Sequence, residues 1–323
     1  VFSNGVDKGA QISIKTGNVE DMTTFEEFYN AYKAQETYMI GLMVNAINAI
    51  DTAHSERVPL PFLSCMVEDC VKEGKTVQEG GAHYNFTGPQ GFGIANMADG
   101  LWAVKTLVFD EKKVTMAELK DALIHNYGQG LSPKAAKNAT QEVVINLAKA
   151  GKSVNESQVA DICRMFLIGE QDPTKRKRYE EILDMINELP KYGNDIEEID
   201  MLARDVANIY AKELEKHKNP RGGMFQAGLY PVSANVPLGE QTGATPDGRL
   251  ANTPIADGVG PRQGADTKGP TAAANSVAKL EHGRASNGTL YNQKFHPSAL
   301  SGNAGLQNFA SYIRAFFDQK GMH

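Results

Sequence analysis

The sequence predicts a helix-rich α/β protein, and two contrasting regions carry that prediction. Residues 24–218 show helical periodicity almost throughout, with clear signals for the starts of helices. Residues 221–288 are instead rich in Gly, Pro, Asn, Asp and Thr, with apolar residues interspersed among them. A long irregular segment inside a compact domain usually carries function, so we expect ordered loops around a cavity.

Helix starts can be read from capping residues. A Thr or Asn three positions before Glu or Gln lets two side chains satisfy free backbone N–H groups, and Ser before Pro marks a cap followed by the first helical residue. These signals occur at Thr24 with Glu27, Thr115 with Glu118, Asn155 with Gln158, and Ser132 with Pro133. Apolar residues then recur at intervals of three and four, which predicts buried stripes over 159–167 and 179–189.

The later region contains one segment with the periodicity of a strand. Val232, Ala234 and Val236 alternate with polar residues, and prolines bracket the segment at 231 and 237. Met224 and Phe225 would then lie at the mouth of this strand, where a substrate would contact the protein; the alternative is that both are core residues.

A second short strand is expected over 288–295, followed by a closing helix over 298–317. We therefore divide the chain into two parts. Residues 1–218 form a mainly helical part with a Gly-rich loop at 79–93, and residues 219–323 form a part rich in loops and strands.

Composition disfavours several classes of partner. The 323-residue chain has a net charge of −6, whereas a nucleic-acid-binding protein usually carries a concentrated basic face. No run of about 18 apolar residues occurs, so we expect no membrane span. Cys65, Cys70 and Cys163 match neither a CxxC pair nor a zinc motif, which indicates free thiols in a reducing compartment, the cytoplasm. A buried structural thiol is favoured for Cys65.

Motifs that would name a reaction are weak or absent. Gly91-Phe92-Gly93 partly matches a dinucleotide fingerprint, but Asn96 replaces its third Gly and no apolar strand precedes it. Asp51 and His54 can share one helix face, yet such a pair is more often hydrogen-bonded than metal-binding. The GxSxG, HExxH and GxxxxGK[ST] motifs do not occur. We expect no metal or cofactor site in this chain.

A set of short phrases is spread over nearly the whole chain. The helical part contains Val1-Phe2-Ser3-Asn4-Gly5, Asn48-Ala49-Ile50-Asp51-Thr52-Ala53-His54, Pro59-Leu60-Pro61-Phe62-Leu63-Ser64, Gly80-Gly81-Ala82-His83-Tyr84-Asn85-Phe86-Thr87-Gly88-Pro89-Gln90-Gly91 and Lys191-Tyr192-Gly193-Asn194-Asp195. The later part contains Arg221-Gly222-Gly223, Val232-Ser233-Ala234-Asn235-Val236-Pro237-Leu238-Gly239, Thr245-Pro246-Asp247-Gly248-Arg249 and Asn292-Gln293-Lys294-Phe295-His296-Pro297. In this order the set resembles the glycyl-radical enzyme superfamily (pyruvate formate-lyase-like), in its dehydratase and lyase branch.

The resemblance implies a fold and a chemistry. The fold would be the helix-rich portion of a ten-stranded α/β barrel in which a cysteine loop and a glycyl-radical loop meet. The chemistry would be removal of water, an amine or sulfite from a small hydroxylated substrate (a diol or glycerol, choline, hydroxyproline or hydroxyethanesulfonate) by a thiyl-radical mechanism. A radical-SAM activase would install the radical. A cytoplasmic homodimer, in some cases inside a bacterial microcompartment, is the implied assembly.

The sequence departs from the family's pattern at two phrases, and this limits which residue roles can be transferred to it. The family's Gly-Cys-Val-Glu phrase and its Arg-Val-x-Gly-Tyr radical phrase do not occur, and none of the three cysteines matches the catalytic position. We therefore assign no catalytic residue and expect a chain that stops before the glycyl-radical domain, with the radical on a downstream residue outside it. Only Met224 and Phe225 are candidates for substrate binding, and the apolar Met224 disfavours a sulfonate. Alternatives are a non-catalytic fragment or scaffold subunit and a nucleotide-binding α/β enzyme.

Overall fold

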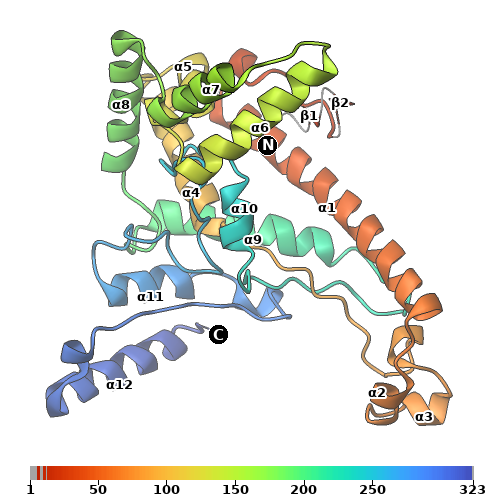
Figure 1. The fold of residues 1–323 in the computed structure, drawn as a ribbon. Coiled ribbons are helices and arrows are strands. Elements are labelled where there is room, and N and C mark those ends of the chain that lie inside the picture. Colours follow the sequence, from red (N-terminus) through yellow and green to blue (C-terminus); the bar gives the residue numbers. More distant parts are fainter. Residues whose placement is uncertain (1–5, 8–9, 12, 322–323) are drawn as a thin grey trace.

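The computed structural model describes residues 6–7, 10–11 and 13–321; the first phrase of the resemblance, residues 1–5, lies outside them. Helices dominate this part of the chain (Figure 1). The longer helices are α1 (Phe25–Arg57), α4 (Ile94–Ala103), α5 (Met116–Ile124), α6 (Pro133–Lys149), α7 (Glu156–Ile168), α8 (Pro173–Glu188), α9 (Glu197–Leu214), α11 (Pro270–Ala278) and α12 (Gly302–Asp318). The shorter elements are α2 (Pro61–Cys65), α3 (Cys70–Glu73), α10 (Asn235–Glu240) and the antiparallel pair β1 (Val6–Asp7) and β2 (Ala10–Gln11).

The predicted helix starts are confirmed. Thr24 caps α1, Thr115 caps α5 and Asn155 caps α7, each in a reciprocal capping box with the residue three positions on. The Ser132 hydroxyl accepts from the Ala135 N–H at the start of α6. The closing helix is α12, which begins four residues later than expected, after a 3-10 turn at Pro297–Leu300.

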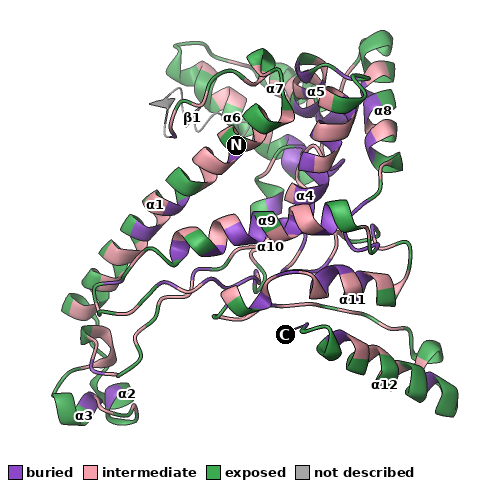
Figure 2. Ribbon diagram, turned by 180° about the vertical axis from the view of Figure 1, so that it is seen from behind, coloured by how far each residue is buried: buried purple, intermediate pink, exposed green. Residues whose placement is uncertain are grey.

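The two predicted stripes differ in burial. On α8, Tyr179, Ile182 and Ile186 are buried, as expected. On α7 no residue is buried and Leu167 is 43% exposed, because this helix packs mainly against its neighbour α6 at one end of the molecule (Figure 2). The amphipathic pattern therefore predicted the helix correctly and its burial wrongly.

The core lies where α4, α9 and α11 meet. Helix α4 packs on α9, and α9 packs on α1 and α11. A second apolar cluster joins α5 and α8 to the π-helical segment Val104–Asp110 that continues α4. In Figure 1, α1 runs from this region to a small lobe formed by α2 and α3. No helix of the described residues is long and apolar enough to cross a membrane.

Three extended segments run parallel beside these helices, and we call them the ladder: residues 86–91, 224–230 and 287–290. The Thr87 N–H donates to the Met224 carbonyl at 3.0 Å, and the Gly91 N–H donates to the Gly228 carbonyl at 2.7 Å. The Leu229 N–H donates to the Gly288 carbonyl at 2.9 Å, which joins the third segment. Parallel pairing beside helices is the arrangement of an α/β protein.

The strand expected over 232–236 is wrong. The Ala234 N–H donates to the Pro231 carbonyl and the Leu238 N–H to the Ala234 carbonyl, so the chain turns there into α10. Pro237 fits because it lies in the first turn, where its missing N–H has no helical partner to lose. The second expected strand, 288–295, is reduced to a single bridge between Thr289 and Leu229.

Candidate functional site: the open face of the ladder

Side chains of the middle ladder segment alternate between two faces. Phe225, Ala227 and Leu229 are buried against the helices, at 1%, 1% and 3% exposure. Residues of opposite parity point the other way in an extended chain, so Met224, which is 40% exposed, faces away from the helices with Tyr230. We call this second surface the open face.

The alternation separates the two residues expected to bind substrate. The Phe225 side chain lies in an apolar cluster with Ile40, Val44 and Leu214 of α1 and α9. Its ring also contacts the edge of the His217 ring, at 6.4 Å between centroids. Phe225 therefore occupies a core position, the alternative left open by the sequence, whereas Met224 stays on the open face.

A polar cluster lies on the open face at Tyr230. The Asn287 amide nitrogen donates to the Tyr230 hydroxyl at 2.9 Å and to the Gly88 carbonyl at 3.2 Å. A Cβ at Gly88 would lie 2.1 Å from this nitrogen, and a Cβ at Gly228 would lie 2.8 Å from the Tyr230 ring. Both glycines therefore leave the space that the amide and the ring occupy.

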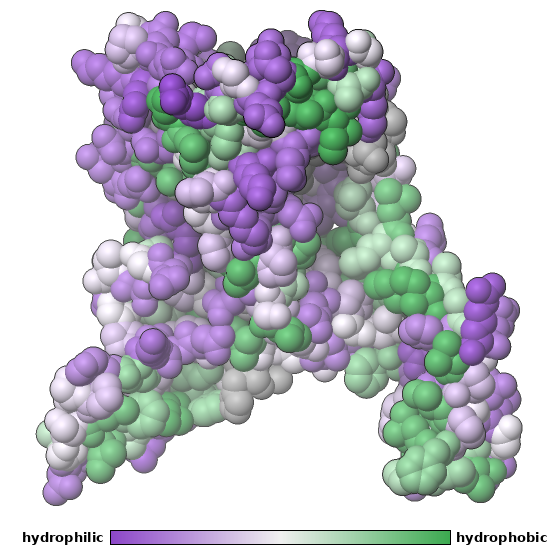
Figure 3. Space-filling view, in the orientation of Figure 1, coloured by the Kyte–Doolittle hydropathy of each residue, from purple (hydrophilic) through white to green (hydrophobic). Residues whose placement is uncertain are grey.

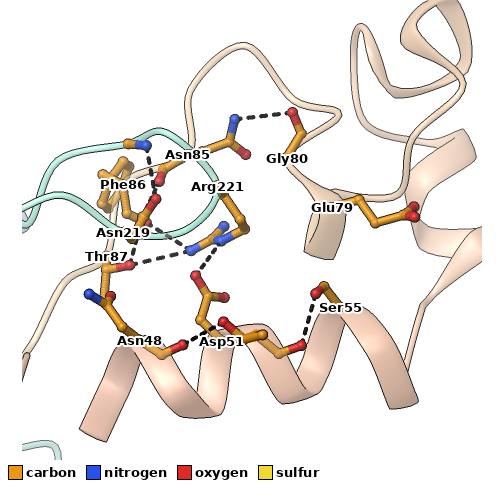
Figure 4. A network of polar contacts seen from close by, with 12 residues as sticks. Asn48, Asp51, Ser55, Glu79, Gly80, Asn85, Phe86, Thr87, Asn219 and Arg221 are labelled. Carbon is orange, nitrogen blue, oxygen red and sulfur yellow. Dashed lines mark hydrogen bonds and ion pairs between the residues drawn. The ribbon is translucent and has the colours of Figure 1, made fainter. Parts of the chain in front are cut away.

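A brace of polar side chains holds the first two ladder segments in register (Figure 4). The Arg221 Nε donates to the Asp51 carboxylate on α1 at 2.9 Å, and the Arg221 Nη2 lies 3.4 Å from the Thr87 hydroxyl. The Asn219 amide nitrogen donates to the same hydroxyl at 2.8 Å, and its oxygen accepts from the Gly223 N–H at 2.8 Å. These bonds connect α1 to the start of two segments that are far apart in the sequence.

The brace also accounts for Asp51, which was weighed as a metal ligand together with His54. Its carboxylate is paired with Arg221 in a half-buried ion pair. Within the described residues, no group of three or more His, Cys, Asp or Glu side chains is placed to hold a metal ion.

The Gly91-Phe92-Gly93 stretch is part of the ladder and its exit. The Gly91 N–H donates to the Gly228 carbonyl and the Gly93 N–H to the Ala256 carbonyl, so these amides are not free to cradle a pyrophosphate. Asn96 is buried and binds the Asp247 carboxylate at 2.6 Å and the Ala256 N–H at 2.7 Å. The geometry does not favour a nucleotide site here.

A buried carboxyl of α4 is hydrogen-bonded to one phrase of the resemblance, residues 191–195. Asp99 of α4 accepts from the Tyr192 N–H at 2.7 Å, and its second oxygen has no hydrogen-bond partner among the described residues. Burial raises the pKa of Asp99 to about 7, against the Tyr192 bond and nearby Lys191, which both lower it. Such shifts occur at functional sites and also in structural networks. Asp99 touches no residue of the open face, so we treat it as structural.

A second charged cluster joins α9 to α11. The Lys279 ammonium lies 2.8 Å from Asp195, 2.9 Å from Glu197 and 2.8 Å from Asp200. The Asp200 side chain is fully buried, and its burial raises its pKa against the opposing effect of Lys279. The lysine therefore compensates a carboxylate that would otherwise be buried alone.

A pocket of about 620 Å³ lies between α1 and α4. Its walls are mainly apolar and include Phe28, Tyr32, Met97 and Leu101. None of Met224, Tyr230 and Asn287 lines it. Because it lacks a cluster of reactive groups, we do not assign chemistry to it.

The expectation of a buried thiol at Cys65 is wrong. Cys65 is exposed and Cys70 is the buried cysteine. Around Cys65, the small lobe of α2 and α3 exposes large apolar side chains, with Phe62 at 77% and Met66 at 67% exposure (Figure 3). The apolar sequence around Cys65 indicated burial that the described residues do not provide.

Sequence reasoning missed Tyr230 and Asn287. Tyr230 could have been found from period-two alternation, had the strand been placed over 224–230 and not over 232–236. Asn287 carried no such signal, because its contact with Tyr230 depends on pairing between segments 57 positions apart.

Comparison with known proteins gives the family. The family model described as Pyruvate formate lyase-like matches residues 1–239, and the one described as Glycine radical matches residues 255–323. The expectation that this chain contains nothing of the glycyl-radical domain is therefore wrong, although the radical phrase itself is absent from the sequence.

Curated relatives include trans-4-hydroxy-L-proline dehydratase of Clostridioides difficile, 33% identical over all of this chain and 35% of its own length. Another is (2S)-3-sulfopropanediol dehydratase of Klebsiella oxytoca, 33% identical over 98% of this chain and 33% of its own length. This chain thus spans about a third of the length of these relatives.

Solved structures agree over the full length of this chain. One, from a study of 1,2-propanediol dehydration in Roseburia inulinivorans, is 61% identical with a TM-score of 0.90, over 38% of that chain. The B12-independent glycerol dehydratase of Clostridium butyricum is 49% identical with a TM-score of 0.81, over 35% of that chain. Ordered phrases, a helix-flanked parallel ladder and a family model that matches residues 1–239 lead to one conclusion: this chain belongs to the pyruvate formate lyase-like family of glycyl-radical proteins.

Proposed function

We propose that this chain is part of a longer glycyl-radical dehydratase that removes water from a small vicinal diol such as 1,2-propanediol or glycerol. The observation that carries the proposal is the uncharged open face of the ladder. Met224, Gln226, Tyr230 and Asn287 offer hydrogen bonds and apolar contact, and Arg221 at its edge is paired with Asp51. A sulfonate, a carboxylate or a quaternary ammonium would be better served by an opposite charge.

The likeness to solved proteins supports the same substrate class. The Roseburia and Clostridium butyricum proteins are named for 1,2-propanediol and glycerol, and they share 61% and 49% of residues with this chain. The relatives named for hydroxyproline and sulfopropanediol, whose substrates carry charge, share 33%. In this proposal the group eliminated is water, and elimination of an amine or sulfite belongs to other members of the family.

In this proposal the ladder is one stretch of the wall of a ten-stranded barrel. Its helix face anchors it through Phe225, Ala227 and Leu229, and its open face bounds the reaction chamber. A closed wall keeps water and oxygen from reactive intermediates. Met224 would contact the apolar part of the substrate, and Phe225 would support the wall from behind.

The residues of this chain do not themselves carry the radical. Neither the Gly-Cys-Val-Glu phrase nor the Arg-Val-x-Gly-Tyr phrase occurs, so we place no radical step on them. A glycyl radical, installed elsewhere in the longer protein by a radical-SAM activase, would supply hydrogen abstraction. This chain would bind the diol, orient its hydroxyls and exclude water. A homodimer in the cytoplasm or in a bacterial microcompartment completes the proposal.

The test begins with the coding sequence on both sides of this chain. We expect the cysteine phrase upstream and the radical phrase downstream; absence of either would favour a non-catalytic scaffold. The longer protein, activated without oxygen, should convert 1,2-propanediol to propanal and glycerol to 3-hydroxypropanal. Turnover restricted to choline, hydroxyproline or hydroxyethanesulfonate would contradict the assignment. Micromolar binding of NAD or ATP by this chain would favour the nucleotide-binding alternative.

A further inference from the structure

The hydrogen bond between Asn287 and Tyr230 has a defined direction. An amide nitrogen only donates, so the Tyr230 oxygen is the acceptor in the 2.9 Å bond. The same nitrogen also lies 3.2 Å from the Gly88 carbonyl. With the amide turned over, its oxygen would face that carbonyl oxygen, and two acceptors would repel each other. The Gly88 carbonyl therefore decides which end of the Asn287 amide meets the tyrosine.

This direction leaves the Tyr230 proton unused. Among the described residues, the Tyr230 hydroxyl accepts a hydrogen bond from Asn287 and donates to no acceptor. A phenol has one proton to donate, and a partly buried donor without a partner costs free energy. Tyr230 is thus prepared to donate to an oxygen that the described residues do not supply.

The surroundings are shaped for this arrangement. A Cβ at Gly228 would lie 2.8 Å from the Tyr230 ring and 2.9 Å from the Asn287 amide nitrogen, and a Cβ at Gly88 would lie 2.1 Å from that nitrogen. The Asn287 N–H also donates to the Ala227 carbonyl at 3.0 Å, so the ladder itself holds the residue in place. Any side chain at either glycine would displace the pair.

We propose that Asn287 is a positioning residue that turns the Tyr230 hydroxyl into a hydrogen-bond donor for a hydroxyl oxygen of the substrate. The inference rests on the proposed function, since it takes the open face as the substrate-binding surface. Asn287 acts through Tyr230 and need not touch the substrate. Loss of either partner therefore weakens the same contact.

The experiment is a double-mutant cycle in the intact, anaerobically activated enzyme. Tyr230→Phe removes the donor and Asn287→Ala removes its support, and each should raise KM by about tenfold, the factor of one hydrogen bond. Because both act on one contact, the double variant should have the KM of Tyr230→Phe alone. The glycyl-radical yield by EPR should be unchanged in all three. Asn146→Ala, at an exposed position of α6, is the control and should match the parent.

Two results would overturn the inference. If the two KM effects multiply in the double variant, Asn287 acts independently of the hydroxyl. If Asn287→Ala lowers radical yield and stability with KM unchanged, its role is structural. This test is separable from that of the proposed function. If the parent enzyme turns over another substrate, the diol assignment fails and the cycle is run on that substrate. Non-additive effects on its KM would still support the coupling of Asn287 and Tyr230.

Discussion

Asp99 provides a prediction about the pH dependence of stability. Its carboxyl is fully buried on α4, it accepts from the Tyr192 N–H at 2.7 Å, and burial raises its pKa to about 7. The change Asp99→Asn keeps an oxygen for the Tyr192 N–H and removes the ionisable group. We therefore expect the variant to lose part of the pH dependence with little change in the fold.

The sign follows from proton uptake. In the unfolded chain an Asp ionises near pH 3.9, whereas the folded Asp99 holds its proton until about pH 7. Between these values the folded state binds more protons, so stability falls as the pH rises. A pKa difference of about three corresponds to about 4 kcal/mol, and about 2 kcal/mol of this loss falls between pH 5 and 7. Above about pH 8, where Asp99 is ionised in both states, the contribution is constant.

The assay is urea denaturation followed by circular dichroism at intervals from pH 5 to 8. Glu36, whose pKa burial also raises to about 7, should leave a residual slope in both proteins, so the difference between them reports Asp99. Asp184→Asn, at an exposed position of α8, is the matched control. Identical stability profiles for the parent and Asp99→Asn would refute the reasoning.

Three further expectations concern charge, core and activity. Lys279→Met should cost about 3 kcal/mol in the free energy of unfolding because it leaves the buried Asp200 unpaired, whereas Lys279→Arg should cost less; equal values by denaturation would contradict this. Phe225→Ala should lower the free energy of unfolding by about 3 to 5 kcal/mol because its ring is in the core, while Met224→Ala in the intact enzyme should raise KM at unchanged stability. If Met224→Ala destabilised the protein and Phe225→Ala changed only KM, the two assignments would be reversed. The chain as given should show no turnover of diols, choline or hydroxyethanesulfonate even with an activase and without oxygen, and any turnover would contradict it.

The helices were predictable to the extent that their signals are local. Thr24 and Glu27 are three positions apart, so their reciprocal bonds form wherever the chain starts a helix there. The segment around Val232 shows the limit of such reasoning. Its period of two fits a strand, yet the turn bonds from Ala234 to Pro231 and from Leu238 to Ala234 start a helix, and a strand without neighbouring strands to pair with is not stable.

Burial was harder to predict than secondary structure. The apolar stripes of α7 and α8 are similar in sequence, but only α8 packs its stripe into a core with α5. Cys65 is a second example. Its sequence neighbours are apolar, yet the lobe that contains it leaves it exposed. Periodicity reports which face of a helix is apolar and says nothing about what lies against it.

The sequence by itself determined the family, the helix starts and the absence of both radical phrases, because these depend on residue identity and on spacings of a few positions. Only the tertiary structure decided the site. Segment 224–230 pairs with 86–91 on one side and with 287–290 on the other, both far from it in the sequence. That register buries Phe225 in the core and leaves Met224 on the open face. A side-chain period of two makes a shift of one residue exchange the two faces, so the site depends on long-range pairing that no local pattern specifies.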